Sequence, residues 1–151
     1  KKILNAHSYG VNTVSWSSAY DKISILSHNT DSEYVEKKRL VSGGGDSLIK
    51  IWKEVNGEWF EDAKLDLHSN SIRDVSWSSS LCSQEYFIAS CADDFKVYVW
   101  SSTDLQNWSP VLLNVFSENV WSVSWSLTGE VLAVAYGQNK VSLWRLNAEG
   151  K

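Results

Sequence analysis

The chain has 151 residues, of which 43% are hydrophobic and 21% are charged, and its formal net charge is −4 at pH 7. One sizeable hydrophobic core fits this length, and the acidic balance without a long basic run argues against an electrostatic nucleic-acid interface. No apolar stretch approaches the roughly 18 residues of a membrane span, and nine tryptophans with a single proline favour packed strands over disorder.

Predicted strands follow one another along the chain, and no segment has a convincing helical period. Alternation of apolar and polar residues predicts first strands at 11–16, 72–77 and 120–125. Short apolar runs predict second strands at 40–42, 87–90 and 132–134, and β-rich segments predict third strands at 49–52, 96–100 and 140–144. Outer fourth strands are predicted at 59–67 and 111–115. The fold class is therefore predicted to be all-β.

This order of strands repeats three times, and each unit closes on a tryptophan: Trp52, Trp100 or Trp144. Units of this length with a histidine, an aspartate and a closing tryptophan are typical of β-propeller blades. We predict a partial β-propeller over residues 1–151, with about three four-stranded blades near 9–67, 70–115 and 118–151. Little chain remains for a fourth strand in the last unit, and the chain starts within a pattern, so we expect it to be part of a larger ring.

The first unit is longer than the third by a polar and charged segment. The spacing between paired tryptophans is 36 residues from Trp16 to Trp52 and 19 from Trp125 to Trp144. Since polar segments between strands lie on protein surfaces, we predict an exposed insertion within residues 17–39.

Histidine, serine and aspartate recur at matching positions in the first two units. The sets are His7, Ser42, Asp46 and Trp52, and then His68, Ser90, Asp94 and Trp100. A serine-hydrolase triad has no reason to occur twice in successive repeats, whereas buried polar groups that hydrogen-bond in series satisfy one another. We therefore predict a structural hydrogen-bond network within each of these blades, and no catalytic residues.

The third unit lacks this set as a whole. Phe116, Val134 and Gln138 stand at the corresponding positions, while Trp144 is retained. Loss of the imidazole, hydroxyl and carboxylate together avoids leaving one buried polar group unpaired, which costs about 1–3 kcal/mol. This pattern favours the structural interpretation.

Other motifs indicate no cofactor. Gly43, Gly44 and Gly45 precede a predicted strand and are not followed by the Lys-Ser/Thr of a phosphate loop, so we assign them to a tight turn. No His/Cys/Asp/Glu cluster has metal-ligand spacing, and Cys82 and Cys91 are interpreted as reduced thiols. We expect neither a metal nor a cofactor, and the sequence does not identify partner-contact residues.

The nine tryptophans divide into two groups. Six occupy repeat-equivalent positions that we assign to the core: Trp16, Trp52, Trp77, Trp100, Trp125 and Trp144. The other three, Trp59, Trp108 and Trp121, are candidates either for a contact surface or for packing specific to one blade.

Longer strings carry a more specific resemblance. They are VNTVSW at 11–16, SGGGDSLIKIWK at 42–53, IRDVSW at 72–77, VWSVSWS at 120–126 and NKVSLW at 139–144. Together they resemble the C-terminal half of the Sec-thirteen family of WD-repeat β-propellers. The chain departs from the WD pattern because Lys53, Ser101 and Arg145 follow the closing tryptophans, and its 17–39 segment is divergent.

The resemblance implies an open six-bladed propeller that acts as a non-enzymatic scaffold. The scaffold would be part of the COPII vesicle coat, which acts in ER-to-Golgi protein transport, and of the nuclear pore complex. The implied partner is an α-solenoid COPII outer-coat subunit or a Y-complex nucleoporin that inserts a seventh blade, so that contact with membranes is indirect. Unpaired edge strands of an open ring are suited to such strand addition.

Two alternatives remain open at this point, the paralogous nuclear-pore propeller and a WD-repeat peptide-binding adaptor. Phosphopeptide adaptors present several arginines on one face. Because the chain has only Arg39, Arg73 and Arg145, the sequence favours the scaffold.

Overall fold

The computed structural model describes residues 2–17, 38–79 and 85–145. Within these ranges the chain forms eleven strands and no helix, and so no helix that could cross a membrane. The first sheet contains β1 (Val11–Trp16), β2 (Arg39–Gly44), β3 (Ile49–Val55) and β4 (Glu58–Leu65). The second contains β5 (Ile72–Trp77), β6 (Tyr86–Ala92), β7 (Lys96–Ser102) and β8 (Ser109–Val115). The third contains β9 (Val120–Trp125), β10 (Val131–Tyr136) and β11 (Lys140–Arg145).

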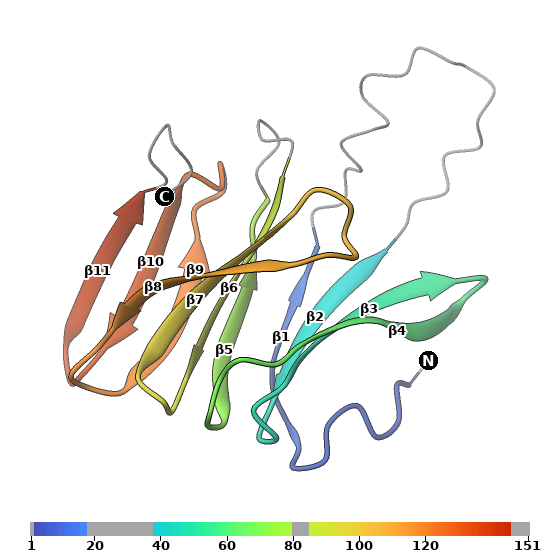
Figure 1. Cartoon of the computed structure of the whole chain (residues 1–151), viewed down its shortest axis with the longest axis horizontal. Coiled ribbons are helices and arrows are strands. Elements are labelled where there is room, and N and C mark those ends of the chain that lie inside the picture. The colour runs from blue at the N-terminus through green and yellow to red at the C-terminus, as the bar shows by residue number, and fades with distance from the viewer. Residues whose placement is uncertain (1, 18–37, 80–84, 146–151) are drawn as a thin grey trace.

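The three sheets are antiparallel meanders that stand side by side like the blades of a fan (Figure 1). In each sheet neighbouring strands follow one another in the chain, and the inner strands β1, β5 and β9 lie against each other in that order. This arrangement confirms the predicted all-β propeller architecture. The third sheet has three strands in the part of the chain that the structure describes, and most of the predicted 17–39 insertion, residues 18–37, lies outside it.

The turns show which residues take left-handed backbone conformations. Asn56 and Gly57, with φ of 52° and 81°, connect β3 to β4 as a two-residue hairpin, the geometry that best matches strand twist. In the β2–β3 turn the residue with positive φ is Ser47, at 66°.

The turn prediction is correct for Gly45, which lies in the turn between β2 and β3, and wrong for Gly43 and Gly44. Gly43 and Gly44 lie within β2, and a Cβ added to them would overlap Ile72 and His7, respectively. Their missing side chains allow the next sheet and the His7 ring to approach the strand closely.

Hydrophobic side chains fill the two spaces between the sheets. Between the first and second sheets, Ile49 and Ile51 of β3 pack in one buried cluster with Ile72 of β5. Between the second and third sheets, Val97 and Val99 of β7 pack with residues of β9 and β10. Each sheet is thus apolar on both faces, but only the middle sheet is covered on both sides.

Trp16 shows the consequence of an uncovered face. Its equivalent Trp77 is only 6% exposed, because it packs against the first sheet, whereas Trp16 is 63% exposed. The prediction that Trp16 lies in the core is wrong for the described structure, since no sheet covers that face of the first one.

Backbone N–H groups on the inner edges of the sheets are capped by side chains of the preceding sheet. The Trp77 N–H donates to Ser15 Oγ at 3.0 Å, and the Trp125 N–H donates to Ser76 Oγ at 3.3 Å. An edge strand leaves alternate N–H groups unpaired, and buried N–H groups require an acceptor. These serines supply acceptors without adding another strand to the sheet.

Asp74 connects all three sheets through one carboxylate. Thr13 Oγ1, from the first sheet, donates to Oδ1 at 2.7 Å. In the third sheet, Ser122 Oγ and the Val123 N–H donate to Oδ2 at 2.6 and 3.0 Å. Hydrogen bonds to a charged acceptor are stronger than neutral ones, so we expect this residue to stabilise the stacking of the sheets.

Replacement of Asp74 tests this role. We expect Asp74→Ala to lower the free energy of unfolding by about 1–3 kcal/mol, because it leaves donors of two neighbouring sheets without their acceptor. The measurement is urea unfolding followed by tryptophan fluorescence. The matched control is Asp93→Ala, which removes an exposed ion pair with Arg73 and should cost less than about 1 kcal/mol. Equal losses in the two variants would contradict the bridging role.

Candidate functional site

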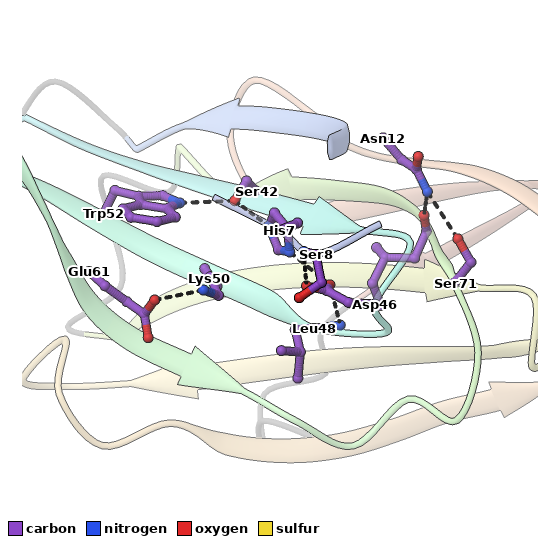
Figure 2. Close-up of polar contacts among 11 residues, drawn as sticks. His7, Ser8, Asn12, Ser42, Asp46, Leu48, Lys50, Trp52, Glu61 and Ser71 are labelled. Atoms are coloured by element: carbon purple, nitrogen blue, oxygen red, sulfur yellow. Dashed lines mark hydrogen bonds and ion pairs between the residues drawn. The ribbon is translucent and has the colours of Figure 1, made fainter. Parts of the chain in front are cut away.

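The first candidate set is assembled as a continuous chain of hydrogen bonds (Figure 2). Trp52 Nε1 donates to Ser42 Oγ at 2.9 Å, and Ser42 Oγ lies 2.8 Å from His7 Nε2. His7 Nδ1 lies 2.8 Å from Asp46 Oδ1. The backbone N–H of Ser8 donates to Asp46 Oδ2 at 3.0 Å, so the carboxylate also anchors the segment before β1.

The second set has the same geometry. Trp100 Nε1 donates to Ser90 Oγ at 2.9 Å, and Ser90 Oγ lies 2.9 Å from His68 Nε2. His68 Nδ1 lies 3.0 Å from Asp94 Oδ2, which also accepts the Ser69 N–H at 3.0 Å. The structure thus brings all eight predicted residues together in two sets of four. Each set links the second and third strands of a sheet to the segment before its first strand.

One direction of donation satisfies every group in each set. The indole N–H donates to the serine oxygen, the serine hydroxyl donates to Nε2 of a neutral histidine, and Nδ1–H donates to the carboxylate. The hydroxyls of Ser42 and Ser90 are buried, so neither is accessible to a substrate carbonyl. The geometry therefore suits a structural network, which stays our prediction for these residues.

Burial and hydrogen bonding shift the pKa values in the second set. Burial lowers the pKa of His68 below its usual value, and the nearby Asp94 carboxylate only partly offsets this. Burial alone would raise the pKa of Asp94, but the Ser69 N–H and the His68 ring together hold it below its usual value. A neutral imidazole beside an ionised carboxylate is the state that these shifts favour near neutral pH.

In the first set the Asp46 carboxyl behaves in the same way. Burial raises its pKa, and the hydrogen bonds from the Ser8 N–H and His7 outweigh that effect, so the pKa lies below its usual value.

The third sheet replaces the network with apolar contacts. Phe116 and Val134 are buried, and the Phe116 ring lies 4.6 Å from that of Tyr136 and 6.4 Å from that of Trp144. The indole N–H of Trp144 donates to Ser142 Oγ at 2.8 Å instead. The polar members are therefore absent as a set, and the retained tryptophan finds another acceptor.

The three tryptophans outside the repeat pattern lie in different environments. Trp108 packs edge-on against Trp77 at 5.8 Å and serves packing within the second sheet. Trp59 lies 5.8 Å from the exposed Trp16. Trp121 is exposed, donates to the Gly137 carbonyl at 2.6 Å and lies 5.8 Å from the Arg73 guanidinium. Of the three, Trp121 is the most exposed at the surface.

Within residues 2–17, 38–79 and 85–145 no group of three or more His, Cys, Asp or Glu side chains is placed to hold a metal ion. Cys91 is buried, and burial raises the pKa of its thiol to about 12. It is therefore an unreactive packing residue. Cys82 lies outside the described residues.

Sequence reasoning missed an open apolar face on the third sheet. Val141 and Leu143 of β11 are 68% and 72% exposed, and we call them, with Ser124 of β9, the open face of the third sheet. The residues at the same repeat positions of the first sheet, Ile49 and Ile51, are fully buried. The outer face of the first sheet is exposed in the same way, at Val14 (65%) and Trp16 (63%). The sequence signal was present, but periodicity does not reveal which face lacks a neighbour.

The fold and its repeated networks define a WD-repeat propeller segment. The WD domain, G-beta repeat family matches residues 1–53, 61–101 and 111–145, which is most of the chain. The chain therefore belongs to the WD-repeat family, whose members are built as structural rather than enzymatic scaffolds.

Within that family, the predicted resemblance to the Sec-thirteen group is confirmed. The chain is 45% identical over its full length to the Protein SEC13 homolog of Drosophila melanogaster and to that of Homo sapiens, covering 43% and 48% of those proteins. It is 42% identical, over 99% of its length, to the Protein transport protein sec13 of Neurospora crassa, of which it covers 50%. The chain thus spans about half the length of these relatives.

The second network generates a stability prediction. We expect His68→Ala to lower the free energy of unfolding by about 1–3 kcal/mol, because the buried Ser90 hydroxyl loses the acceptor for its proton and the Asp94 carboxylate loses the imidazole donor. Urea unfolding checks this. The control is Gln138→Ala, an exposed site at the repeat position of Asp94, for which a change within about 0.5 kcal/mol is expected. A His68→Ala variant as stable as the control would refute the network role.

The lowered pKa of His68 predicts a dependence of stability on pH. Below about pH 6.5 the unfolded chain binds a proton at this histidine more readily than the folded chain. Stability should therefore fall as pH drops from 7 toward the lower folded pKa, and the lowered pKa values of Asp46 and Asp94 should extend the fall below about pH 4. Urea unfolding at a series of pH values from 8 down to about 2 measures this. The profile of His68→Gln should be flatter between about pH 7 and 5, and parallel profiles would argue against the assignment.

Proposed function

We propose that this chain is part of a non-enzymatic scaffold for protein transport, in which a partner chain completes the propeller. The observation that carries the proposal is the match of the whole chain to Sec-thirteen relatives, one of which is named as a protein transport protein. The open face of the third sheet, with Val141 and Leu143, is the surface that we propose for the partner.

The finer proposal follows the resemblance. The scaffold would belong to the COPII vesicle coat and to the nuclear pore complex, and its partner would be an α-solenoid coat subunit or Y-complex nucleoporin that inserts a seventh blade. The protein would then act in the cytoplasm at ER and COPII vesicle membranes, and at the nuclear pore, with membrane contact only through the coat. Exposed sheet edges and apolar faces are suited to strand insertion.

The peptide-adaptor alternative has less physical support. A phosphopeptide site needs several free arginines on one face. Among the three arginines, Arg39 is paired with Asp62, Arg73 with Asp93 and Arg145 with Glu130.

Affinity purification of the tagged full-length protein from its own cells, followed by mass spectrometry, tests the proposal. We expect an α-solenoid protein in equal stoichiometry, and its identity distinguishes the coat from the pore. A variant with Leu143→Asp should lose this partner, because it places a charge on the proposed contact face. Recovery of neither an α-solenoid coat subunit nor a pore scaffold would refute the scaffold, and short-motif clients in their place would support the adaptor.

A further inference from the structure

In each sheet the turn between the second and third strands is tied to the segment that leads into the first strand. We call residues 7–10, 68–71 and 116–119 the entry segments of the three sheets. The first N–H of the turn donates to the last carbonyl of the entry segment: Gly45 to Gly10 at 3.1 Å, Asp93 to Ser71 at 3.0 Å and Gly137 to Asn119 at 2.9 Å. All three donor residues are half-buried. This shared bond lets the entry segments be compared by what else holds them.

Buried polar contacts hold the entry segments of the first two sheets. In the first sheet, Asp46 accepts hydrogen bonds from the His7 ring and from the Ser8 N–H. The second sheet has the same contacts, with Asp94 as the acceptor. Both histidine side chains are fully buried, and the two carboxylates are at most 8% exposed. Dissolved salt screens buried pairs much less than exposed ones, so we expect these anchors to be insensitive to ionic strength.

Polar contacts at the surface hold the entry segment of the third sheet. Gln138 stands where the aspartates stand, and it is exposed. Glu118 instead forms an ion pair with Lys140 of β11, and these side chains are 35% and 50% exposed. Trp121 Nε1 donates to the Gly137 carbonyl at 2.6 Å. A Cβ at Gly137 would overlap the Glu118 carboxylate, so the glycine lets this carboxylate lie against the turn. Exposed ion pairs contribute little stability and are screened by salt.

One buried contact remains in the third entry segment. The Phe116 ring packs against the rings of Tyr136 and Trp144, and this apolar contact anchors the first residue of the segment. None of the three residues between Phe116 and β9 is buried. Screening by salt therefore acts on the part of the segment that follows Phe116, next to the Gly137 turn.

The second sheet combines both kinds of contact. Arg73, at the repeat position of Trp121, forms an exposed ion pair with Asp93. The buried network of His68 holds the same entry segment as well. In the third sheet the surface contacts have no buried polar network beside them, because Phe116 and Val134 replace the histidine and the serine.

We propose that the entry segment of the third sheet is a salt-sensitive latch. It opens locally, with the bond between Gly137 and Asn119 broken and the sheets still folded, more often than the other two entry segments do. Rising ionic strength opens it further, because salt screens the pair of Glu118 and Lys140. The inference goes beyond the proposed function and does not depend on it.

Amide hydrogen exchange of the full-length protein, measured by NMR, tests the latch at the three equivalent N–H groups. After correction for intrinsic rates, the Gly137 N–H should exchange about five- to 100-fold faster than those of Gly45 and Asp93, the factor expected for the lack of a buried polar anchor. When NaCl is raised from about 0.02 to 0.5 M, the Gly137 rate should rise about two- to fivefold. The Gly45 rate should stay the same, because its entry segment is held by buried contacts alone.

Charge variants separate the latch from general effects of salt. Lys140→Gln removes the ion pair, so it should raise the Gly137 exchange rate at low salt to the value that the parent protein has at high salt, and it should remove the dependence on salt. The matched control is Lys96→Gln, at the same repeat position of the second sheet, which should change the Gly137 rate less than about 1.5-fold.

A converse variant installs the buried network in the third sheet. Phe116→His, Val134→Ser and Gln138→Asp together supply the histidine, serine and aspartate of the other two sets. The Gly137 N–H should then exchange nearly as slowly as that of Asp93, and salt should no longer affect it. Where this triple variant does not fold, Lys140→Gln and its control decide the matter.

Two results would overturn the latch. One is equal exchange of the Gly137 and Asp93 N–H groups, which would show that the surface contacts hold the entry segment as firmly as a buried network. The other is a Gly137 rate that responds neither to salt nor to Lys140→Gln. Both results would leave the proposed scaffold intact, since it is tested by the recovery of a partner and not by exchange rates.

Discussion

Every sheet of this protein needs a neighbour on both sides, and the rest of the structure depends on this constraint. A sheet whose two faces are both apolar buries them only by stacking, and the inner strand of each sheet also has N–H groups that its own sheet leaves unpaired. The middle sheet meets both requirements within the chain. Ile51 and Leu143 occupy the same repeat position, yet one is fully buried and the other is 72% exposed, so the presence of a neighbour, not residue type, decides burial.

The polar interactions form two sets, one within each sheet and one between neighbouring sheets. The His–Ser–Asp–Trp networks act within one sheet, where they join the segment before the first strand to the second and third strands. Ser15, Ser76 and Asp74 act between sheets, where they accept hydrogen bonds from inner-strand N–H groups that would otherwise lack partners. Both systems leave few buried polar groups unsatisfied, which is what allows an apolar stack to contain so many hydroxyls.

The functional argument follows from repetition and exposure. Residues that resemble a catalytic triad occur twice, are buried and are lost together in the third repeat, as expected of packing and not of chemistry. Exposed apolar surface lies instead at the two ends of the described stack, at Val14 and Trp16 and at Val141 and Leu143. These are the positions that a further sheet would cover, as the neighbouring sheets cover the middle one.

The sequence alone determined the all-β fold, the strand positions and both sets of network residues, because alternation and repeat spacing are local properties that each strand carries in its own residues. It also anticipated that Phe116 and Val134 replace the network. Only the tertiary structure decided that Trp16 is exposed, that Gly43 and Gly44 allow close approach and that Asp74 joins three sheets. The physical reason is that these properties depend on which surface lies next to a residue in space, and a repeat pattern is the same whether or not the neighbouring sheet is present.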